Sequence, residues 1–372
     1  MKLSVVILNY NVRYFLELCI KSVIAATSKL DAEILVIDNN SKDDSRQMVA
    51  DLFPAVKWIQ NTTNVGFSKA NNQAVTHARG EYICILNPDT VVSEDTFIKL
   101  LNFSETKENL GIVGCKLIDG TGKYLPESKR NIPYVSAAIK KMFGASEAYY
   151  ASHLLPDDIG RADIFVGAFM FLRREVYMQV KGFDEDYFMY GEDVDISYKI
   201  LKAGFDNYYF GNTTVIHFKG ESTLKDKKYA RRFYGAMQIF YRKHFKKNMV
   251  FDALVWLGLK AAFLFRQAPK THSKQVKQYF FIGTHGIAAL ENVLVNDLKP
   301  LKLTENIPLF SEVILDANTL SYKQIITYLS QFENDNKVSF KILPDNSNFI
   351  IGSDDSINQG QVILFKKSFK NS

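Results

Sequence analysis

The chain has 372 residues, of which 47% are hydrophobic and 23% are charged, and its formal net charge is +6. This composition excludes an intrinsically disordered chain and leaves room for two or three domains, each with its own core. The three cysteines, Cys19, Cys84 and Cys115, lie far apart in apolar stretches. We therefore expect buried free thiols rather than a disulfide or a metal cluster, which favours a reducing compartment.

The positive charge is concentrated in one block of the sequence. Between Lys219 and Lys302 there are 17 Lys and Arg residues against 5 Asp and Glu residues, so the rest of the chain is net acidic. Such a block favours a membrane surface as partner over nucleic acid, because no nucleic-acid motif accompanies it, although a solvated helical face would also explain it. The apolar run from Leu3 to Leu8 is too short for a signal sequence, so we expect a cytoplasmic protein.

Strand and helix patterns alternate along the first hundred residues. Continuous apolar runs separated by helices predict an α/β fold in which a parallel sheet is covered on both faces. Ligands of such sheets bind beyond the carboxyl ends of the strands, where Asn9, Asp38 and Asn87 fall. The expected strands are 3–8, 33–37, 56–59 and 82–86, and the expected helices are 13–26, a helix capped by 41–44 that ends near 52, and 68–78.

The pattern is looser after residue 111. Residues 250–266 form a helical pattern in which Asp252, Lys260 and Arg266 fall within about 120° of one another. These charges argue against a spanning helix and favour a helix in the membrane interface, with a buried domain contact as the alternative. The other expected elements are strands at 112–117, 164–172, 208–210 and 214–217, helices at 191–203 and 225–247, and a final βαβ-like piece made of 312–316, 322–332, 338–343, 349–351 and 362–365.

These elements divide the chain into three parts. Residues 1–222 form the main α/β domain, 223–300 a basic and amphipathic helical region, and 301–372 a small α/β segment after a linker near Pro300–Pro308.

Two loops at the predicted strand ends have residues suited to a nucleotide. Asp38 could accept the imide N–H of a uracil or thymine ring, although a helix-capping turn explains the same residues. Gly66 would let backbone amides approach a ligand at the start of the helix that carries Asn72, where phosphate is favoured. The sequence has no G-x-G-x-x-G after the first strand and no P-loop, which argues against a dinucleotide oxidoreductase or a P-loop enzyme.

Three further segments carry groups for metal and base chemistry. In Asn87-Pro88-Asp89 the carboxylate follows a strand, where a metal that bridges two phosphates would sit. Gly191-Glu192-Asp193 opens a helix, and His217 closes a strand. Taken singly, these segments are also explained by a strand-ending turn, an acidic helix start stabilised by the helix dipole, and a buried structural histidine.

The order of these residues along the chain resembles the inverting family 2 glycosyltransferases of the GT-A fold. The resemblance covers about residues 1–245 and includes the opening segment from Val5 to Asn11 and the segment from His217 to Ser222. It implies a mixed, Rossmann-like GT-A sheet with helices on both faces.

By this resemblance Asp89 is the principal metal-binding carboxylate and His217 a further ligand of Mg²⁺ or Mn²⁺. Asp193 is the catalytic base, and Glu192 supports the acceptor hydroxyls or positions Asp193. Asn87 stands where many members carry Asp, which implies weaker metal binding. The residues implied in nucleotide-sugar binding are Asn9, Asn11, Asp38 as the reader of the pyrimidine base, Asn40, Asn64, Gly66, Asn72 and Asn87.

The form Leu86-Asn87-Pro88-Asp89 is similar to that of rhamnosyltransferase-like bacterial members, which implies a UDP-sugar or dTDP-sugar donor. We expect a single displacement with inversion. The expected acceptor is a glycan or a polyprenyl-diphosphate-linked oligosaccharide at the inner face of the cytoplasmic membrane. The final ~60 residues are similar to part of the Rossmann-like domain of bacterial polyprenyl-phosphate sugar-phosphate transferases, and we assign them no chemistry. The oligomeric state stays open.

Other functions fit the sequence less well. A sugar-nucleotidyltransferase shares the strand–helix start but needs a Gly-rich loop after the first strand, and residues 9–13 contain no glycine. A non-catalytic sugar-nucleotide-binding or membrane scaffold would not require Asp89, Asp193 and His217 together. A processive polysaccharide synthase would need spanning helices, which the sequence does not predict.

Overall fold

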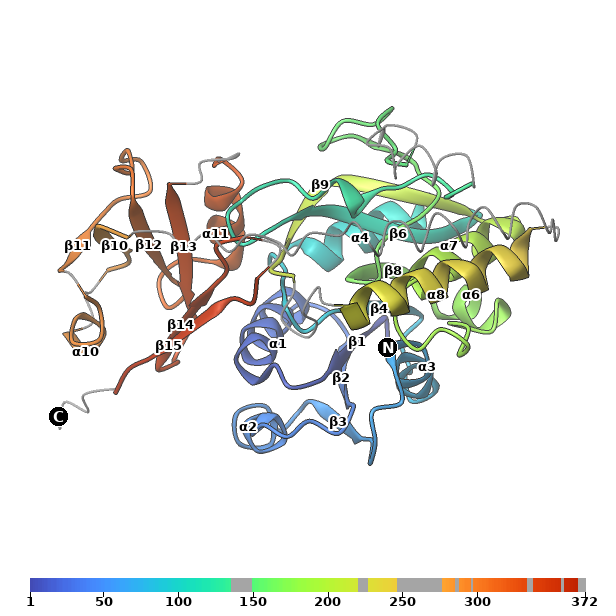
Figure 1. The fold of residues 1–372 in the computed structure, drawn as a ribbon, viewed down its shortest axis with the longest axis horizontal. Helices are drawn as coiled ribbons and strands as arrows, with labels where there is room; N and C mark the ends of the chain where they lie inside the picture. The colour runs from blue at the N-terminus through green and yellow to red at the C-terminus, as the bar shows by residue number, and fades with distance from the viewer. Residues whose placement is uncertain are drawn as a thin grey trace.

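The structure is a computed structural model that describes residues 1–134, 149–219, 227–245, 276–284, 288–295, 297–332, 337–355 and 358–366. It contains two β-sheets with helices packed on them, and the two sheet domains lie side by side (Figure 1). The segment 250–266 lies outside the described residues, so the interfacial helix stays a prediction.

The first sheet has nine strands in the order β3-β2-β1-β4-β8-β6-β9-β5, with β7 paired to β9. The strands from β3 to β4 are parallel, as predicted from their continuous apolar runs. Beyond β4 the sheet is mixed, because β8 pairs antiparallel with both β4 and β6. The strands are β1 Leu3–Asn9, β2 Ala32–Asp38, β3 Lys57–Gln60, β4 Tyr82–Leu86, β5 Thr90–Val91, β6 Leu110–Ile118, β7 Ile159–Arg161, β8 Phe169–Arg173 and β9 Asp206–His217.

Helices cover both faces of this sheet, because successive strand residues point to opposite sides. Val5 and Ile7 of β1 pack in one core cluster with the apolar sides of α1, α2 and α4, whereas Val6 packs in another with α3, α6 and α7. The helices are α1 Arg13–Thr27, α2 Ser45–Leu52, α3 Phe67–Thr76, α4 Thr96–Glu105, the 3₁₀ turn η1 Pro126–Ser128, α6 Arg174–Gln179, α7 Glu192–Lys202 and α8 Lys227–His244.

Two elements of the main domain differ from their predicted form. The expected strands 208–210 and 214–217 are parts of the single strand β9. Its pairing with β6 shifts register between Phe210 and Thr214, and this bulge takes up the polar residues between them. The expected strand 164–172 begins only at Phe169, while Ile164 forms an isolated bridge with Arg130.

The second sheet has six strands in the order β11-β10-β12-β13-β14-β15. It is parallel from β11 to β13 and antiparallel beyond. Residues 278–300 were predicted to belong to the helical region, but they supply the strands β10 and β11. The aromatic run from Tyr279 to Phe281 forms β10 and pairs with β12. The elements are β10 Gln278–Ile282, α10 Ala288–Glu291, β11 Leu298–Pro300, β12 Ser311–Asp316, α11 Tyr322–Leu329, β13 Val338–Leu343, β14 Phe349–Gly352 and β15 Gln361–Leu364.

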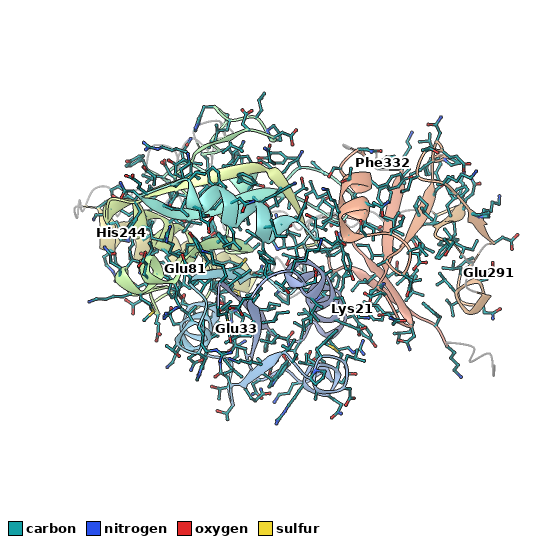
Figure 2. All side chains as sticks on the ribbon, turned by 180° about the vertical axis from the view of Figure 1, so that it is seen from behind. Lys21, Glu33, Glu81, His244, Glu291 and Phe332 are labelled. Carbon is teal, nitrogen blue, oxygen red and sulfur yellow. The ribbon has the colours of Figure 1, made fainter. Side chains whose placement is uncertain are left out.

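The two domains share a hydrophobic core. Phe15 of α1, Val91 of β5 and Ile216 of β9 pack in one cluster with the apolar side chains of β12, β13 and α11. Polar contacts add to this interface: the Glu94 carboxylate accepts the main-chain N–H groups that open α11, and Lys21 donates to Ser347 at 2.7 Å. Figure 2 shows Lys21 where the two domains meet. The second domain is therefore anchored to α1, β5 and β9.

Candidate active site

The ends of β1, β2 and β3 are joined by hydrogen bonds to one carboxylate. Asp38 is buried and pairs in register with Asn9 and Gln60, whose side-chain amides donate to its two oxygens at 2.7 Å each. Ser41 also donates to both oxygens, through its main-chain N–H and its hydroxyl. Four donors hold Asp38 as the anchor of this strand end. Its reading of a pyrimidine base stays a prediction.

Asn9 leaves hydrogen-bonding capacity unused at the same place. Its Nδ2 donates to Asp38 and Ser41, but its buried Oδ1 has no partner among the described residues. Because buried polar atoms are nearly always hydrogen-bonded in native proteins, such an atom indicates a place for a ligand or a water molecule.

Asn11 and Asn40 shape the two loops that follow β1 and β2. Both have positive φ values, 56° and 63°, a conformation that asparagine tolerates better than most residues. The Asn11 side chain accepts the main-chain N–H of Lys42 at 2.6 Å, and the Asn40 side chain accepts from the Lys42 ammonium at 3.1 Å. The two loops are thus tied together, and ligand binding by either residue stays a prediction.

Gly66 is required for a different reason from the predicted one. At φ +88° it precedes α3, and a Cβ built on it would lie 2.5 Å from the main-chain oxygen of Phe188. That oxygen accepts the N–H of Phe67 at 2.7 Å. Asn64 accepts the Gly66 N–H at 3.0 Å and so holds the loop. The close approach in this structure is therefore between two protein segments, and ligand binding by the Gly66 backbone stays a prediction.

Asn72 has a structural role. Its amide donates to the main-chain oxygen of Phe183 and to Glu185, and its carbonyl accepts from Tyr177 and from the Phe183 N–H. The side chain therefore cross-links α3 to the segment before α7. No hydrogen-bonding capacity of its N–H₂ group remains for a nucleotide sugar.

The predicted metal residues come together where β4 ends and β5 pairs with β9. Thr90 is opposite His217, so that Asp89 lies beside the imidazole. Asp89 Oδ1 is 3.4 Å from His217 Nε2, and Asn87 Nδ2 is 3.4 Å from the same nitrogen. Asp89 and His217 are both buried. Three side chains from two distant segments thus converge on one point.

This donor set suits a divalent cation. A carboxylate oxygen is an ordinary ligand of Mg²⁺ and Mn²⁺, and an imidazole nitrogen is a common ligand of transition-metal ions. Two neighbouring ligands about 2.1 Å from one octahedral ion are about 3 Å apart, close to the separation seen here. No group of three or more His, Cys, Asp or Glu side chains that could hold a metal occurs in the described ranges. Asp89 and His217 therefore offer two ligands, and further ligands would have to come from a substrate or water.

Asp193 lies in the first turn of α7, where it forms a buried ion pair. Its Oδ2 is 2.6 Å from Nη2 of Arg130, and its Oδ1 accepts the N–H of Val194. Arg130 also donates to the main-chain oxygen of Phe165 at 2.9 Å, which fixes the guanidinium. The pair holds an ionised carboxylate in one orientation while other lone pairs of its oxygens stay free to accept a proton.

Glu192 is in the opposite situation. Its Oε2 is buried and has no hydrogen-bond partner in the described part of the chain. Burial, and after it the negative charge of Asp193, raises the pKa of Glu192 to about 8. Adjacent carboxyl groups whose environments favour different protonation states are typical of catalytic sites.

Two of the residues that support α7 could not be predicted from the sequence. Arg130 is 63 residues from Asp193 and lies in an irregular segment. His244, at the end of α8, contacts the buried Asp195 at 2.6 Å, and Tyr187 donates to the same carboxylate. Only the basic character of α8 was visible in the sequence. A long-range partner of a helix start leaves no local pattern.

Comparison with known proteins decides the family. The model of the family "Glycosyl transferase family 2" matches residues 4–180, which contain β1 to β8 and the Asn87–Asp89 turn. Residues 4–180 form a family 2 glycosyltransferase domain. This result confirms the predicted family and the predicted enzyme class.

Two curated relatives of the glycosyltransferase domain are bacterial rhamnosyltransferases. N-acetylglucosaminyl-diphospho-decaprenol L-rhamnosyltransferase of Mycobacterium tuberculosis is 27% identical over 244 residues, which are 60% of this chain and 78% of that protein. Rhamnosyltransferase WbbL of Escherichia coli is 27% identical over 199 residues, 51% of this chain and 75% of that protein.

A solved structure shares the fold of this chain. The structure of GalNAc-T7 with UDP, GalNAc and Mn²⁺ aligns with a TM-score of 0.50 at 18% identity, over 64% of this chain and 48% of that chain. The predicted GT-A fold is confirmed. In the described ranges no helix is both long and apolar enough to span a bilayer.

Proposed function

We propose that this glycosyltransferase transfers a sugar from a UDP-sugar or dTDP-sugar to a hydroxyl of a glycan or lipid-linked acceptor, by a metal-dependent single displacement with inversion. The observation that carries the proposal is the convergence of Asn87, Asp89 and His217 at the end of β4, on the same sheet edge as the unpartnered Asn9 Oδ1. A cation bound at such a place, beside a nucleotide site, can neutralise the diphosphate that leaves during sugar transfer.

Asp89 and His217 would hold the cation. The bound cation would act as a Lewis acid that neutralises the negative charge developing on the departing diphosphate. The GalNAc-T7 structure contains Mn²⁺ and UDP, and we extend the cation class to this chain as part of the proposal. Asn87 in place of a carboxylate reduces the negative charge of the set, so we expect weaker cation binding than with two aspartates.

Asp193 would accept the proton of the attacking hydroxyl. Arg130 holds the Asp193 carboxylate in position, which lowers the entropy lost when the acceptor is bound. Glu192, protonated at neutral pH, would donate a hydrogen bond to an acceptor oxygen. Attack from the side of Asp193, opposite the departing diphosphate, inverts the anomeric centre.

The donor and acceptor classes are supported by the relatives. The M. tuberculosis relative is named for rhamnosyl transfer to a decaprenyl-diphosphate-linked sugar, and the E. coli relative is also a rhamnosyltransferase. We therefore propose dTDP-rhamnose as the first donor to assay and a polyprenyl-diphosphate-linked sugar as the first acceptor.

Nucleotide release from a panel of UDP-, dTDP- and GDP-sugars tests the proposal. We expect release from a UDP- or dTDP-sugar with Mn²⁺ or Mg²⁺ and none with EDTA, with a product of inverted anomeric configuration by NMR. No release from any donor would refute glycosyl transfer. Release unaffected by EDTA would refute the cation, and a retained configuration would refute the single displacement.

We further propose that the basic block binds the anionic inner face of the cytoplasmic membrane. Deletion of residues 225–268 would be a poor test, because α8 packs against α7 through Ala236 and Phe240. Replacement of Lys246 and Lys247 by Gln is a better test, because it removes two positive charges of the basic block and keeps α8. We expect the variant to float less with anionic vesicles and to behave like wild type with neutral ones. Unchanged flotation with anionic vesicles would contradict the proposal.

A further inference from the structure

An exposed aromatic ring and an unpaired guanidinium lie together beside the start of α7. The side chain of Phe188 is 41% exposed, and the guanidinium carbon of Arg232 on α8 is 5.1 Å from the centre of its ring. Arg232 is exposed and has no acidic partner within the described ranges. Lys243 on the same helix differs, because it is paired with both Asp184 and Asp186. Asp184 and Asp186 therefore neutralise Lys243, whereas no acidic residue of the described ranges neutralises Arg232.

The main chain under this pair is fixed from two sides. The Phe188 carbonyl accepts the N–H of Phe67 at the start of α3. Three residues later, Gly191 caps α7 at φ +79°, and a Cβ built there would lie 3.1 Å from Ala236 and 3.3 Å from Met237 of α8. Any other residue at this position would be strained and would press on α8. The ring of Phe188 is thus exposed on a rigid support.

The pair also lies next to the proposed base. A Cβ built on Gly167 would be 3.4 Å from the Phe67 ring and 3.6 Å from the Cβ of Asp193, so α3 and α7 meet there. The Phe188 carbonyl accepts the main-chain N–H of the same Phe67. Asp193 and the pair of Phe188 and Arg232 therefore both adjoin Phe67 at the start of α3.

The chemistry of the two side chains is complementary. An aromatic face packs against the C–H face of a sugar, and a guanidinium binds phosphate oxygens through two parallel hydrogen bonds. The cation–π contact holds the Arg232 side chain in place before a ligand arrives. We propose that Phe188 and Arg232 form an acceptor subsite in which the ring supports the acceptor sugar and the guanidinium binds its phosphate. The subsite rests on the proposed function, because it assigns the acceptor of the same reaction.

The test compares two synthetic acceptors that carry the same sugar, one on an alkyl diphosphate and one on a plain alkyl group. For Arg232→Ala we expect the KM of the diphosphate acceptor to rise about tenfold to a hundredfold, because hydrogen bonds to a charged group are lost. The KM of the alkyl glycoside and the KM of the donor in acceptor-free hydrolysis should stay within about twofold of wild type. The KM of Arg232→Lys for the diphosphate acceptor should lie between the values for wild type and Arg232→Ala, since lysine keeps the charge but not the planar fork of the guanidinium.

Phe188→Ala should raise the KM of both acceptors about threefold to tenfold, and Phe188→Tyr should restore them. Arg242→Ala is the matched control, because it removes the same charge from an exposed position on α8. It should leave each KM unchanged.

Several results would overturn the subsite. An equal rise in donor KM for Arg232→Ala would assign the guanidinium to the donor diphosphate instead. If Arg232→Ala changes the KM of the two acceptors equally, or changes neither, Arg232 does not bind the acceptor phosphate. If the wild-type protein transfers sugar but the variants do not show the expected changes in KM, the subsite is wrong and the proposed function stands. If the wild-type protein releases nucleotide from no donor, the proposed function fails and the subsite fails with it.

Discussion

The two sheets of this chain carry similar polar residues at their carboxyl ends but use them differently. In the first sheet Asp38 ends β2, and Asp89 follows β4 after three residues. In the second sheet Asp316 ends β12, and Asp345 follows β13 after two. Both positions are those at which open parallel sheets bind ligands. Topology alone therefore does not tell which sheet has a site.

In the second sheet the polar groups are used within the protein. Asp316 accepts the N–H and the side-chain amide of Asn318, and Asp345 accepts from Tyr322. Lys21 of α1 donates to the main-chain oxygen of Asp345 and to Ser347. The edge where a ligand would bind is thus an interface with the first domain. The assignment of no chemistry to the C-terminal segment stays a prediction.

In the first sheet polar atoms remain unused. Asn9 Oδ1, His217 Nδ1 and Glu192 Oε2 are all buried and have no hydrogen-bond partner among the described residues. Leaving such atoms unpaired costs about 1–3 kcal/mol each, and substrates are the natural partners. The second domain also has buried atoms without a hydrogen-bond partner, on Tyr328, Lys341 and Asp354, but among the described residues Asp316 and Asp345 have no such atom. Unused hydrogen-bonding capacity beside the strand ends, more than position, therefore distinguishes the site from the interface.

Of the substitutions that test this comparison, Asp193→Asn should have the largest effect on the rate of sugar transfer. We expect transfer to fall about 10²–10⁴-fold, because the amide cannot accept the acceptor proton, while donor binding stays close to wild type. Initial rates and donor titration by calorimetry measure the two effects. Asp186→Asn, an exposed carboxylate that pairs with Lys243, is the control and should keep full activity. Turnover of Asp193→Asn within tenfold of wild type would remove it as the base.

A smaller effect on stability should come from Glu192→Gln. The folded-state pKa of Glu192 is raised from 4.5 to about 8, so the folded state retains the proton that the unfolded state loses. The stabilisation is complete below about pH 4.5, falls as the pH rises towards 8, and is lost above it. We expect the variant to equal wild type near pH 5 and to be more stable by at least about 1 kcal/mol at pH 9. Urea unfolding at the two pH values measures this, and parallel behaviour of both proteins would contradict the buried neutral carboxyl.

The smallest effect should come from Glu94→Ala in the domain interface. The substitution removes the carboxylate that accepts the N–H groups of Tyr322 and Lys323, so we expect a loss of about 1 kcal/mol of stability. The rate of transfer should stay within about twofold of wild type. Glu94→Gln should lose less stability, because it keeps one acceptor oxygen. A large fall in rate with unchanged stability would show that the interface takes part in the reaction.

Much of the first sheet could be predicted because its signals are local. The apolar runs of β1, β2 and β4 are short and bounded by polar residues, so strand ends and the positions of Asn9, Asp38 and Asn87 follow directly. The resemblance then assigned Asp89, Asp193 and His217 to one site. The structure brings Asp89 and His217 together at 3.4 Å.

The rest depends on contacts between distant segments. Arg130 meets Asp193 only because two irregular segments fold onto α7, and nothing in the spacing of the residues predicts it. The close approach of Phe188 to Gly66 could not be predicted from the loop that contains this glycine. Asn72 looked like a ligand residue, but its amide cross-links α3 to Phe183. The strand β10 was missed because its partner β12 begins more than thirty residues later.

The most direct test of the account compares one carboxylate from each sheet. Asp89→Asn and Asp316→Asn both replace a buried aspartate at a strand end by its amide. Cation-dependent nucleotide release from the donor sugar is measured for both variants and for wild type. We expect Asp89→Asn to lose at least about 100-fold in rate, whereas Asp316→Asn should stay within about twofold of wild type. Equal losses, or a loss confined to Asp316→Asn, would contradict it.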